Sequence, residues 1–217
     1  MSDDFRKDFI AFCIEQGVLK FGRFVMKSGR VSPYFFNAGL FNTGKALDRL
    51  AQFYAKAILA SDVKFDMLFG PAYKGIVLAA GTAMVLAREG RNAPFAFNRK
   101  ETKDHGEGGD IIGAPLAGSV LIVDDVMTAG TAVRELLEII RGHGAVPAGV
   151  VISLDRMERG RGDVSAVQEV ERQHGIPVIA IANLDDLMVF LQESAEFRQN
   201  LKAVGEYRKL YGAVQHA

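Results

Sequence analysis

The stretch at residues 120–132, VLIVDDVMTAGTA, constrains the fold more than any other, because it has the pattern of a strand, a loop and a helix start. Its first four residues are apolar without interruption, which is typical of a strand covered on both faces of a parallel sheet. Asp124 and Asp125 follow at the carboxyl end of this strand, where open α/β sheets place their ligand crevices. The sequence therefore predicts an acidic site at the edge of a parallel sheet.

A turn rich in threonine and glycine, residues 128–131, follows the two carboxylates and precedes apolar residues at helical spacing. The backbone N–H groups of such a turn can converge on an anion at a helix N-terminus. Carboxylates suit hydroxyl groups and the turn suits a phosphate, so the stretch predicts a socket for a sugar phosphate. Acidic pairs after strands also occur in Mg-binding receiver domains and nucleotide hydrolases, and some such turns only reverse the chain.

Composition limits the classes to which the protein can belong. Lys plus Arg and Asp plus Glu both number 26 in 217 residues, so the formal net charge is zero. A neutral chain offers no general basic surface, which argues against nucleic acid as a partner. Nearly half of the residues are apolar and the length suits one sizeable core, so we expect a single globular domain over residues 1–217.

The cysteine content and the apolar segments indicate the cellular compartment in which we expect the protein. The lone Cys13 lies on an apolar helical face and has no partner for an internal disulfide, so core packing is its expected role. The N-terminal residues MSDDFRKDF contain no secretory apolar region, and the longest apolar stretch, residues 76–87, is too short to span a bilayer. We therefore expect a cytoplasmic protein without a membrane partner.

Apolar runs and helical periodicities alternate along the chain. Helices are expected at residues 2–16, 45–60, 76–89, 165–174, 185–192 and 195–210, and further strands at 67–69, 95–97, 150–154 and 178–181. This alternation implies right-handed crossovers and an α/β fold with a central parallel sheet flanked by helices. Residues 21–26 and 32–37 flank KSGR as a plausible hairpin, a candidate appendage to the sheet.

A long polar segment at residues 98–110, NRKETKDHGEGGD, contains basic side chains followed by glycines. The basic residues are Arg99, Lys100, Lys103 and His105. With so little apolar content the segment is not expected to pack into a core, so we expect a loop that stays mobile until an anion engages its cations. The alternative is a solvated surface loop.

Two further loops follow expected strands. The turn GPAYKG at residues 70–75 can direct its amides toward a pyrophosphate while Lys74 adds charge, although ordinary turn chemistry is the alternative. Arg156 follows the strand at 150–154, and its alternative is a surface arginine among similar neighbours. Thr128 has the alternative role of a turn former.

The stretch at 120–132 resembles the phosphoribosyl-pyrophosphate (PRPP) signature of the type I phosphoribosyltransferases. Four more segments, FGRFVMKSGRVSPYFFNAG, FGPAYKG, FNRKETKDHGEGG and ISLDRMERGRG, extend the resemblance to the orotate phosphoribosyltransferase family and spread it over residues 21–162. The resemblance implies the type I phosphoribosyltransferase fold, with residues 1–40 contributing most of a small hood. It also implies transfer of the phosphoribosyl group of PRPP to orotate, giving orotidine 5′-monophosphate and pyrophosphate in UMP biosynthesis.

The resemblance assigns roles to individual positions. It implies that Asp124 and Asp125 hold the ribose hydroxyls and that residues 126–132 wrap the 5-phosphate. The implied PRPP-binding residues are Lys27, Tyr73, Lys74, Arg99, Lys100, Lys103, His105, Asp124, Asp125, Val126, Met127, Thr128, Ala129, Gly130, Thr131 and Ala132. The residues implied to surround orotate are Lys27, Phe35, Phe36, Thr128 and Arg156. The two phenylalanines would contact orotate partly through backbone groups. The alternative role of their rings is to form the core of the hairpin.

The implied mechanism depends on charge. Lys103, with His105 and Arg99, stabilises the leaving pyrophosphate, and these three form the catalytic set together with Asp124 and Asp125. Mg²⁺ is the implied cofactor, and we expect it on substrate oxygens and waters without a protein ligand, because it keeps much of its hydration shell. In this family the lid, residues 99–110 here, completes the neighbouring subunit's site, which implies a homodimer.

Rival functions share parts of this pattern. A purine phosphoribosyltransferase would have the same PRPP socket but less reason for the KSGR and FF elements. A PRPP-sensing regulator would not need a lid rich in cations and glycine. A receiver domain would need a lysine after later strands, and none occurs between Lys103 and Lys202.

Overall fold

A six-stranded sheet forms the centre of the computed structural model, which describes residues 5–26, 28–103, 109–127, 130–160 and 162–214. Its strands are β3 (Met67–Phe69), β4 (Phe95–Lys103), β5 (Gly109–Gly113), β6 (Ser119–Val123), β7 (Val146–Asp155) and β8 (Val178–Asn183), in the order β5-β4-β3-β6-β7-β8. The pairings from β4 to β8 are parallel, and β5 joins β4 antiparallel. The predicted α/β fold with a central parallel sheet is confirmed, with one antiparallel strand added at the edge.

Strand β6 separates two apolar cores. All four residues from Val120 to Val123 have no exposed surface. Leu121 and Val123 belong to one cluster of buried side chains, whereas Val120 and Ile122 belong to the other. Because successive side chains of a strand point to opposite faces, an uninterrupted apolar run is what a strand covered on both faces requires. The structure thus confirms the buried strand that the apolar run at residues 120–123 predicted.

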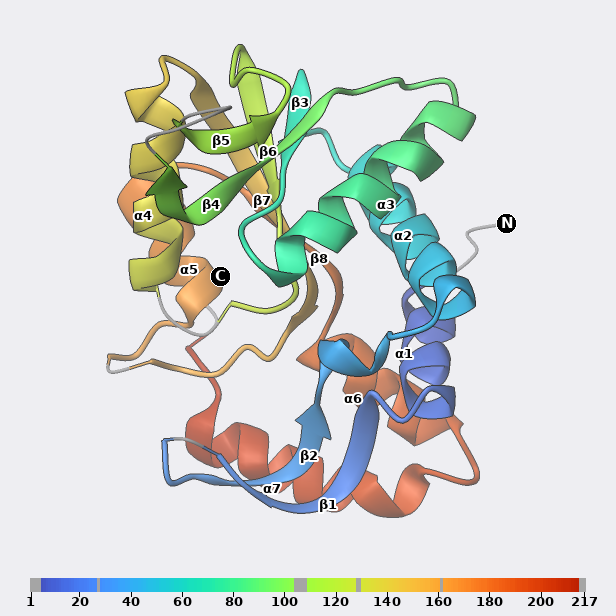
Figure 1. Cartoon of the computed structure of the whole chain (residues 1–217). Helices are drawn as coiled ribbons and strands as arrows, with labels where there is room; N and C mark the ends of the chain where they lie inside the picture. The colour runs from blue at the N-terminus through green and yellow to red at the C-terminus, as the bar shows by residue number, and fades with distance from the viewer. Residues whose placement is uncertain (1–4, 27, 104–108, 128–129, 161, 215–217) are drawn as a thin grey trace.

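Helices cover both faces of the sheet (Figure 1). The helices α1 (Phe5–Glu15), α2 (Gly44–Leu59) and α3 (Lys74–Arg88) lie on one side, and α4 (Gly130–Gly142) and α5 (Ala166–His174) lie on the other. The apolar side chains of α4 pack into the second core cluster with β6. No helix in the described parts of the chain is long and apolar enough to cross a membrane.

A second, two-stranded sheet lies at one end of the molecule (Figure 1). Strands β1 (Leu19–Val25) and β2 (Val31–Phe36) pair antiparallel, as the hairpin pattern predicts, and a short 3₁₀ turn, η1 (Ala38–Leu40), follows. Helix α6 (Leu184–Glu193), the 3₁₀ turn η2 (Arg198–Asn200) and helix α7 (Leu201–Tyr211) complete the chain, and Tyr207 of α7 meets Tyr34 of β2 edge to face at 6.2 Å. The hairpin is therefore covered by the last helix.

Several boundaries differ from the sequence prediction. Helix α7 begins at Leu201 because η2 precedes it, whereas the pattern had placed the helix start near residue 195. Helix α3 begins two residues earlier than expected, at Lys74, and β7 begins four residues earlier, at Val146. Apolar periodicity marks the packed middle of an element better than its ends, which caps and neighbouring strands decide.

The prediction of a loop at residues 98–110 is wrong for its two ends. Strand β4 continues to Lys103, and β5 begins at Gly109, with Asn98 opposite Ile111 and Lys103 opposite Gly109. Residues 104–108 lie outside the described residues. Antiparallel pairing satisfies the backbone groups of this edge hairpin, so its polar side chains need no apolar core to form strands. We call residues 98–110 the arm.

Candidate active site

The two carboxylates at the end of β6 are held by the backbone around them. The amide of Asp124 donates to the carbonyl of Val151 on β7 at 3.0 Å. The amide of Asp125 donates to Oδ1 of Asp124 and the amide of Val126 to Oδ1 of Asp125, both at 2.8 Å. One oxygen of each carboxylate is therefore occupied by a local amide, which fixes how each side chain is oriented.

Two side chains from neighbouring elements hold the carbonyl groups of the same pair. The hydroxyl of Tyr54 on α2 donates to the carbonyl of Asp124 at 2.7 Å. Both the hydroxyl and the amide of Ser153 on β7 donate to the carbonyl of Asp125, the amide at 2.9 Å. Neither residue was predicted from the sequence. Ser153 had a signal, a lone polar residue inside an apolar strand, whereas Tyr54 had none, because it fits the apolar face of its helix.

The surroundings of Asp124 disfavour the charged form of its carboxyl group. The pKa of Asp124 is raised to about 6, mainly because the carboxyl group is buried. The hydrogen bond from the amide of Asp125 lowers this pKa, the negative charge of Asp125 raises it, and the positive charge of Lys74 lowers it. The carboxylate of Asp125 pairs directly with the ammonium of Lys74 at 2.6 Å. A buried carboxylate beside a second one disfavours ionisation, and a nearby cation restores part of it. Lys74 thus joins the acidic pair itself, a contact that the sequence did not predict.

The turn at residues 70–75 closes tightly against the end of β6. A Cβ on Gly70 would lie 2.1 Å from the carbonyl oxygen of Gly75, and one on Gly75 would lie 2.9 Å from that of Val123. Only glycine permits these approaches, so the turn brings Lys74, the first residue of α3, beside Asp125. Ordinary turn chemistry does not account for this close approach to the acidic pair.

The arm meets the same turn. Oδ1 of Asn98 accepts from the amide of Ala72 at 2.9 Å, and the ammonium of Lys100 lies 4.8 Å from the ring centre of Tyr73. Tyr73 is 70% exposed, so it is available to a ligand. Nε of Arg99 is buried and has no hydrogen-bond partner in the described part of the chain. The structure thus brings Tyr73, Lys74 and the start of the arm together within one subunit.

Arg156 is a mostly buried cation between the two sheets. Its side chain is 15% exposed, which rules out the alternative of a surface arginine. Nε donates to Oε1 of Glu158 at 2.8 Å and Nη2 to the hydroxyl of Ser32 at 3.1 Å, while the guanidinium lies 4.2 Å from the ring centre of Tyr34. Ser32 and Tyr34 belong to β2 of the hairpin. The sequence did not predict that Arg156 contacts Ser32, Tyr34 and Glu158.

The two phenylalanines of β2 are placed differently. Along β2, Ser32 and Tyr34 are buried, and the alternation turns Phe35 to the other face, where it is exposed and stacks on Phe24 at 5.4 Å. Phe36 is partly buried and packs against the larger core cluster. The structure therefore supports hairpin packing for both rings, and any contact with a ligand near Arg156 would use their backbone groups.

The structure describes the remaining expected residues only in part. Val126 packs against the larger core cluster and Met127 against the smaller one. Lys103 ends β4, and Gly130, Thr131 and Ala132 begin α4, so the predicted turn does lead into a helix N-terminus. Lys27, His105, Thr128 and Ala129 lie outside the described residues.

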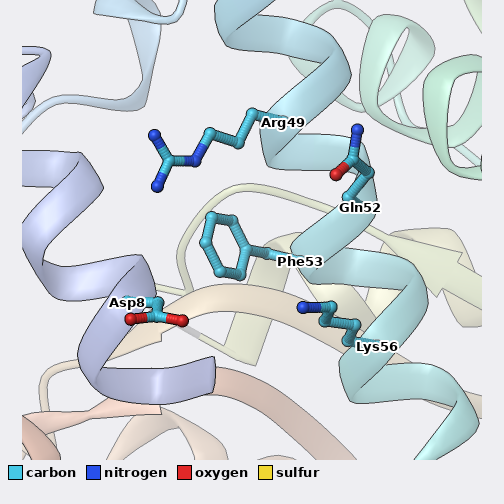
Figure 2. Close-up of a pocket in the computed structure, with 5 residues that line it drawn as sticks. All are labelled: Asp8, Arg49, Gln52, Phe53 and Lys56. Carbon is cyan, nitrogen blue, oxygen red and sulfur yellow. The ribbon is translucent and has the colours of Figure 1, made fainter. Parts of the chain in front are cut away.

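A hollow of about 120 Å³ lies between α1 and α2 (Figure 2). It is lined by Asp8, Arg49, Gln52, Phe53 and Lys56, and includes none of the expected site residues. Arg49 is 4.6 Å from the ring centre of Phe12 and pairs with Glu15 at 3.5 Å. These contacts belong to the packing interface between α1 and α2.

Comparison with known proteins places the chain among its relatives. The model of the phosphoribosyl transferase domain matches residues 40–178. Orotate phosphoribosyltransferase of Chromobacterium violaceum is 64% identical over 96% of this chain and 98% of its own, and that of Laribacter hongkongensis is 65% identical with the same coverage. The crystal structure of orotate phosphoribosyltransferase from Francisella tularensis superimposes with a TM-score of 0.87 at 45% identity, covering 95% of this chain and all of that one. The chain therefore belongs to the phosphoribosyl transferase family and, within it, to the orotate phosphoribosyltransferases.

Proposed function

We propose that this protein transfers the phosphoribosyl group of PRPP to orotate, releasing pyrophosphate and orotidine 5′-monophosphate in UMP biosynthesis. The observation that carries the proposal is the acidic pair at the end of β6, paired with Lys74 of the tight turn. Relatives that share 64–65% of its residues and bear the name of this activity support it. A purine phosphoribosyltransferase would share this socket, but Arg156 gives a reason to select an anionic base.

Binding of the ribose depends on Asp124 and Asp125. Each carboxylate has one oxygen held by a backbone amide, which leaves the other oxygen of Asp124 to accept a ribose hydroxyl. The second oxygen of Asp125 faces Lys74 and lies where it can also accept from the sugar. The positive end of α4 follows directly, so the amides of residues 126–132 would receive the 5-phosphate.

The pyrophosphate would leave toward the turn and the arm. Lys74 contacts Asp125, and Lys100 lies near the ring of Tyr73. We propose that Arg99, Lys103 and His105 approach the same pyrophosphate from the arm of the neighbouring subunit. Negative charge grows on the pyrophosphate as the bond to the anomeric carbon breaks, and one well-aimed donor of this kind commonly contributes about 2.7–4 kcal/mol. Lys103 is the main contributor in this proposal.

Mg²⁺ fits this site as an ion carried by the substrate. Within the described residues no cluster of three or more His, Cys, Asp or Glu side chains could hold a metal, and one carboxylate of the acidic pair is engaged by Lys74. Such a donor set would suit Mg²⁺, which keeps much of its hydration shell and needs few protein ligands. When bound, Mg²⁺ neutralises charge on the pyrophosphate. The protein's own residues orient the ribose and receive the leaving group.

The base would bind between β2 and the end of β7. A carboxylate on a pyrimidine ring suits the guanidinium of Arg156, which is already held beside the hairpin. We place Lys27, Thr128 and the backbone of Phe35 and Phe36 around the same base. The proposal includes a single domain over residues 1–217, in which residues 1–40 form most of the hood.

We further propose a cytoplasmic homodimer in which the arm of one subunit completes the site of the other. The arm stands at the edge of the sheet as a strand pair that begins beside the turn at residues 70–75. A polar hairpin at a sheet edge can extend from one subunit to the next without exposing an apolar core.

The function is tested by measuring pyrophosphate release from PRPP and Mg²⁺ with orotate, uracil, hypoxanthine or adenine as the base. We expect turnover with orotate and with none of the others, because only orotate offers a carboxylate to Arg156. Turnover with a purine would replace the proposal by a purine phosphoribosyltransferase. Binding of PRPP without turnover of any base would favour a PRPP sensor.

Arg156→Ala is expected to raise the KM for orotate much more than the KM for PRPP, by roughly two orders of magnitude if the lost contact is a charge-assisted hydrogen bond. Steady-state kinetics with each substrate varied in turn give both constants. Arg172→Ala, which removes an exposed arginine on α5, is the matched control and should change neither. Equal loss for both substrates would contradict the assignment of Arg156 to the base.

Sharing of the arm predicts complementation between inactive variants. Lys103→Ala and Asp125→Asn homodimers should each be inactive, but heterodimers would contain one intact site. After random subunit exchange, activity should recover to roughly a quarter of the wild-type value, because half of the dimers are mixed and each has one good site. Mass spectrometry confirms exchange, and two batches of one variant serve as the control. Confirmed exchange without recovery would show that the arm acts within its own subunit.

Asp124→Asn is expected to stabilise the free protein at pH 7.5. The pKa of Asp124 is raised from 3.8 to about 6 in the folded state, so the folded protein binds more protons than the unfolded chain between these values and its stability falls as pH rises through that range. Removing the carboxylate should therefore raise the free energy of unfolding by roughly 1–3 kcal/mol at pH 7.5, while weakening PRPP binding.

The measurement is urea unfolding at pH 7.5 and near pH 4.5, where the difference between wild type and Asp124→Asn should shrink. Asp62→Asn, an exposed aspartate between α2 and β3, is the control and should show no such trend. A stability difference that is the same at both pH values would contradict the raised pKa.

A further inference from the structure

Glu158 makes the closest polar contact of Arg156. Oε1 of Glu158 accepts from Nε of Arg156 at 2.8 Å and also contacts Nη2. The two side chains are similarly shielded, with 15% of Arg156 and 18% of Glu158 exposed. A charge pair this shielded from water is much less screened than a surface pair, so it holds its geometry. The orientation of the guanidinium is therefore tied to Glu158.

The donors of Arg156 can be accounted for one by one. A guanidinium carries five N–H donors in a fixed fork. Nε is used by Glu158, and Nη2 is shared between Glu158 and the hydroxyl of Ser32 at 3.1 Å. Ser32 in turn donates to the carbonyl of Tyr34 at 2.7 Å, so its oxygen is fixed as the acceptor. The contacts with Glu158 and Ser32 use Nε and Nη2, which leaves Nη1 for an incoming anion.

Glu158 is itself fixed by the end of the chain and by the hairpin. Its backbone forms a β-bridge with Gly212, directly after α7, and the amide of Arg159 donates to the carbonyl of Tyr211 at 2.9 Å. Nη1 of Arg30 lies 3.8 Å from Oε2 of Glu158, and the same guanidinium lies 4.9 Å from the ring centre of Tyr211. The carboxylate thus has one oxygen for Arg156 and the other toward Arg30.

Tyr34 restricts the remaining freedom of Arg156. The guanidinium lies over its ring at 4.2 Å, and the ring is fully buried and meets Tyr207 edge to face. Stacking on an aromatic face fixes the plane of a guanidinium, whereas the hydrogen bonds to Glu158 and Ser32 fix its rotation within that plane. Both degrees of freedom are set before any ligand arrives.

We propose that Glu158 is a positioning residue for base recognition, which holds the guanidinium of Arg156 so that Nη1 is presented to the carboxylate of the base. The inference rests on the proposed function, because it assumes that Arg156 binds orotate. A long arginine side chain that is ordered in advance loses less conformational freedom on binding. Glu158 could instead compete with the substrate for Arg156, and that alternative predicts the opposite change in orotate affinity.

The test compares Glu158→Ala with Glu158→Gln in steady-state kinetics. Glu158→Ala removes both the charge and the acceptor, and we expect the KM for orotate to rise about tenfold while kcat and the KM for PRPP change less than about twofold. Glu158→Gln keeps an acceptor oxygen and should rescue most of this loss. A merely structural role would move all three constants together and would not be rescued. Glu206→Ala, an exposed glutamate on α7, is the control.

The double variant Arg156→Ala/Glu158→Ala distinguishes the role of Arg156 in binding orotate from the role of Glu158 in positioning Arg156. If Glu158 acts only through Arg156, the double variant should have the same KM for orotate as Arg156→Ala alone. If Arg156→Ala itself leaves the KM for orotate unchanged, the proposed role of Arg156 fails. If Arg156→Ala raises it but Glu158→Ala does not, only the positioning role of Glu158 is overturned.

Two other outcomes would overturn the proposal. A lower KM for orotate in Glu158→Ala and Glu158→Gln would show competition between Glu158 and the substrate. Additive losses in the double variant would show that Glu158 acts independently of Arg156. Should Glu158→Ala fail to fold, Ser32→Ala serves in its place, because it removes the other hydrogen bond that orients Nη2 and should raise the KM for orotate without changing that for PRPP. An unchanged orotate KM in Ser32→Ala would then count against positioning.

Discussion

Two carboxylates placed directly after four completely buried residues of β6 are the constraint on which the rest of the site depends. Burial disfavours the charged form of Asp124 and raises its pKa to about 6. The amide of Asp125 and the ammonium of Lys74 offset part of that cost, and the hydroxyls of Tyr54 and Ser153 satisfy the backbone carbonyl groups of the pair. The acidic pair is therefore costly for stability, and the surrounding backbone fixes its orientation.

Parallel strand order explains why distant segments meet at this pair. The ends of β6 and β7 lie side by side, so Asp125 contacts Ser153, three residues before Arg156. The tight turn after β3 closes on Val123 because Gly70 and Gly75 allow the backbones to approach, and it delivers Lys74. Lys74, Asp125 and Ser153 thus meet at one edge of the central sheet because β3, β6 and β7 are paired there.

The sequence predicted the local parts of this architecture and missed the contacts between them. The apolar run of β6, the acidic pair, the turn into α4 and the hairpin were all recognisable, because each depends on residues close together in the chain. The strands of the arm were missed, because an antiparallel edge pair satisfies its backbone without apolar alternation. Tyr54 could not be found, since a tyrosine on an apolar helical face gives no sign that its hydroxyl reaches Asp124.

The cluster around Arg156 shows how tertiary packing can assign a role that local sequence leaves open. Arg156, Glu158 and Arg159 look alike as charged residues after a strand, yet only Arg156 lies between Ser32 and Tyr34 of the hairpin. Ser32 and Arg156 are 124 positions apart, and the end of α7 holds the backbone beside Glu158. The guanidinium of Arg156 is therefore one contact between the two sheets, beside the contacts of Arg30 with Glu158 and with the carbonyl of Arg159. A ligand that bound Arg156 would thus also bear on the contact between the hairpin and the end of β7.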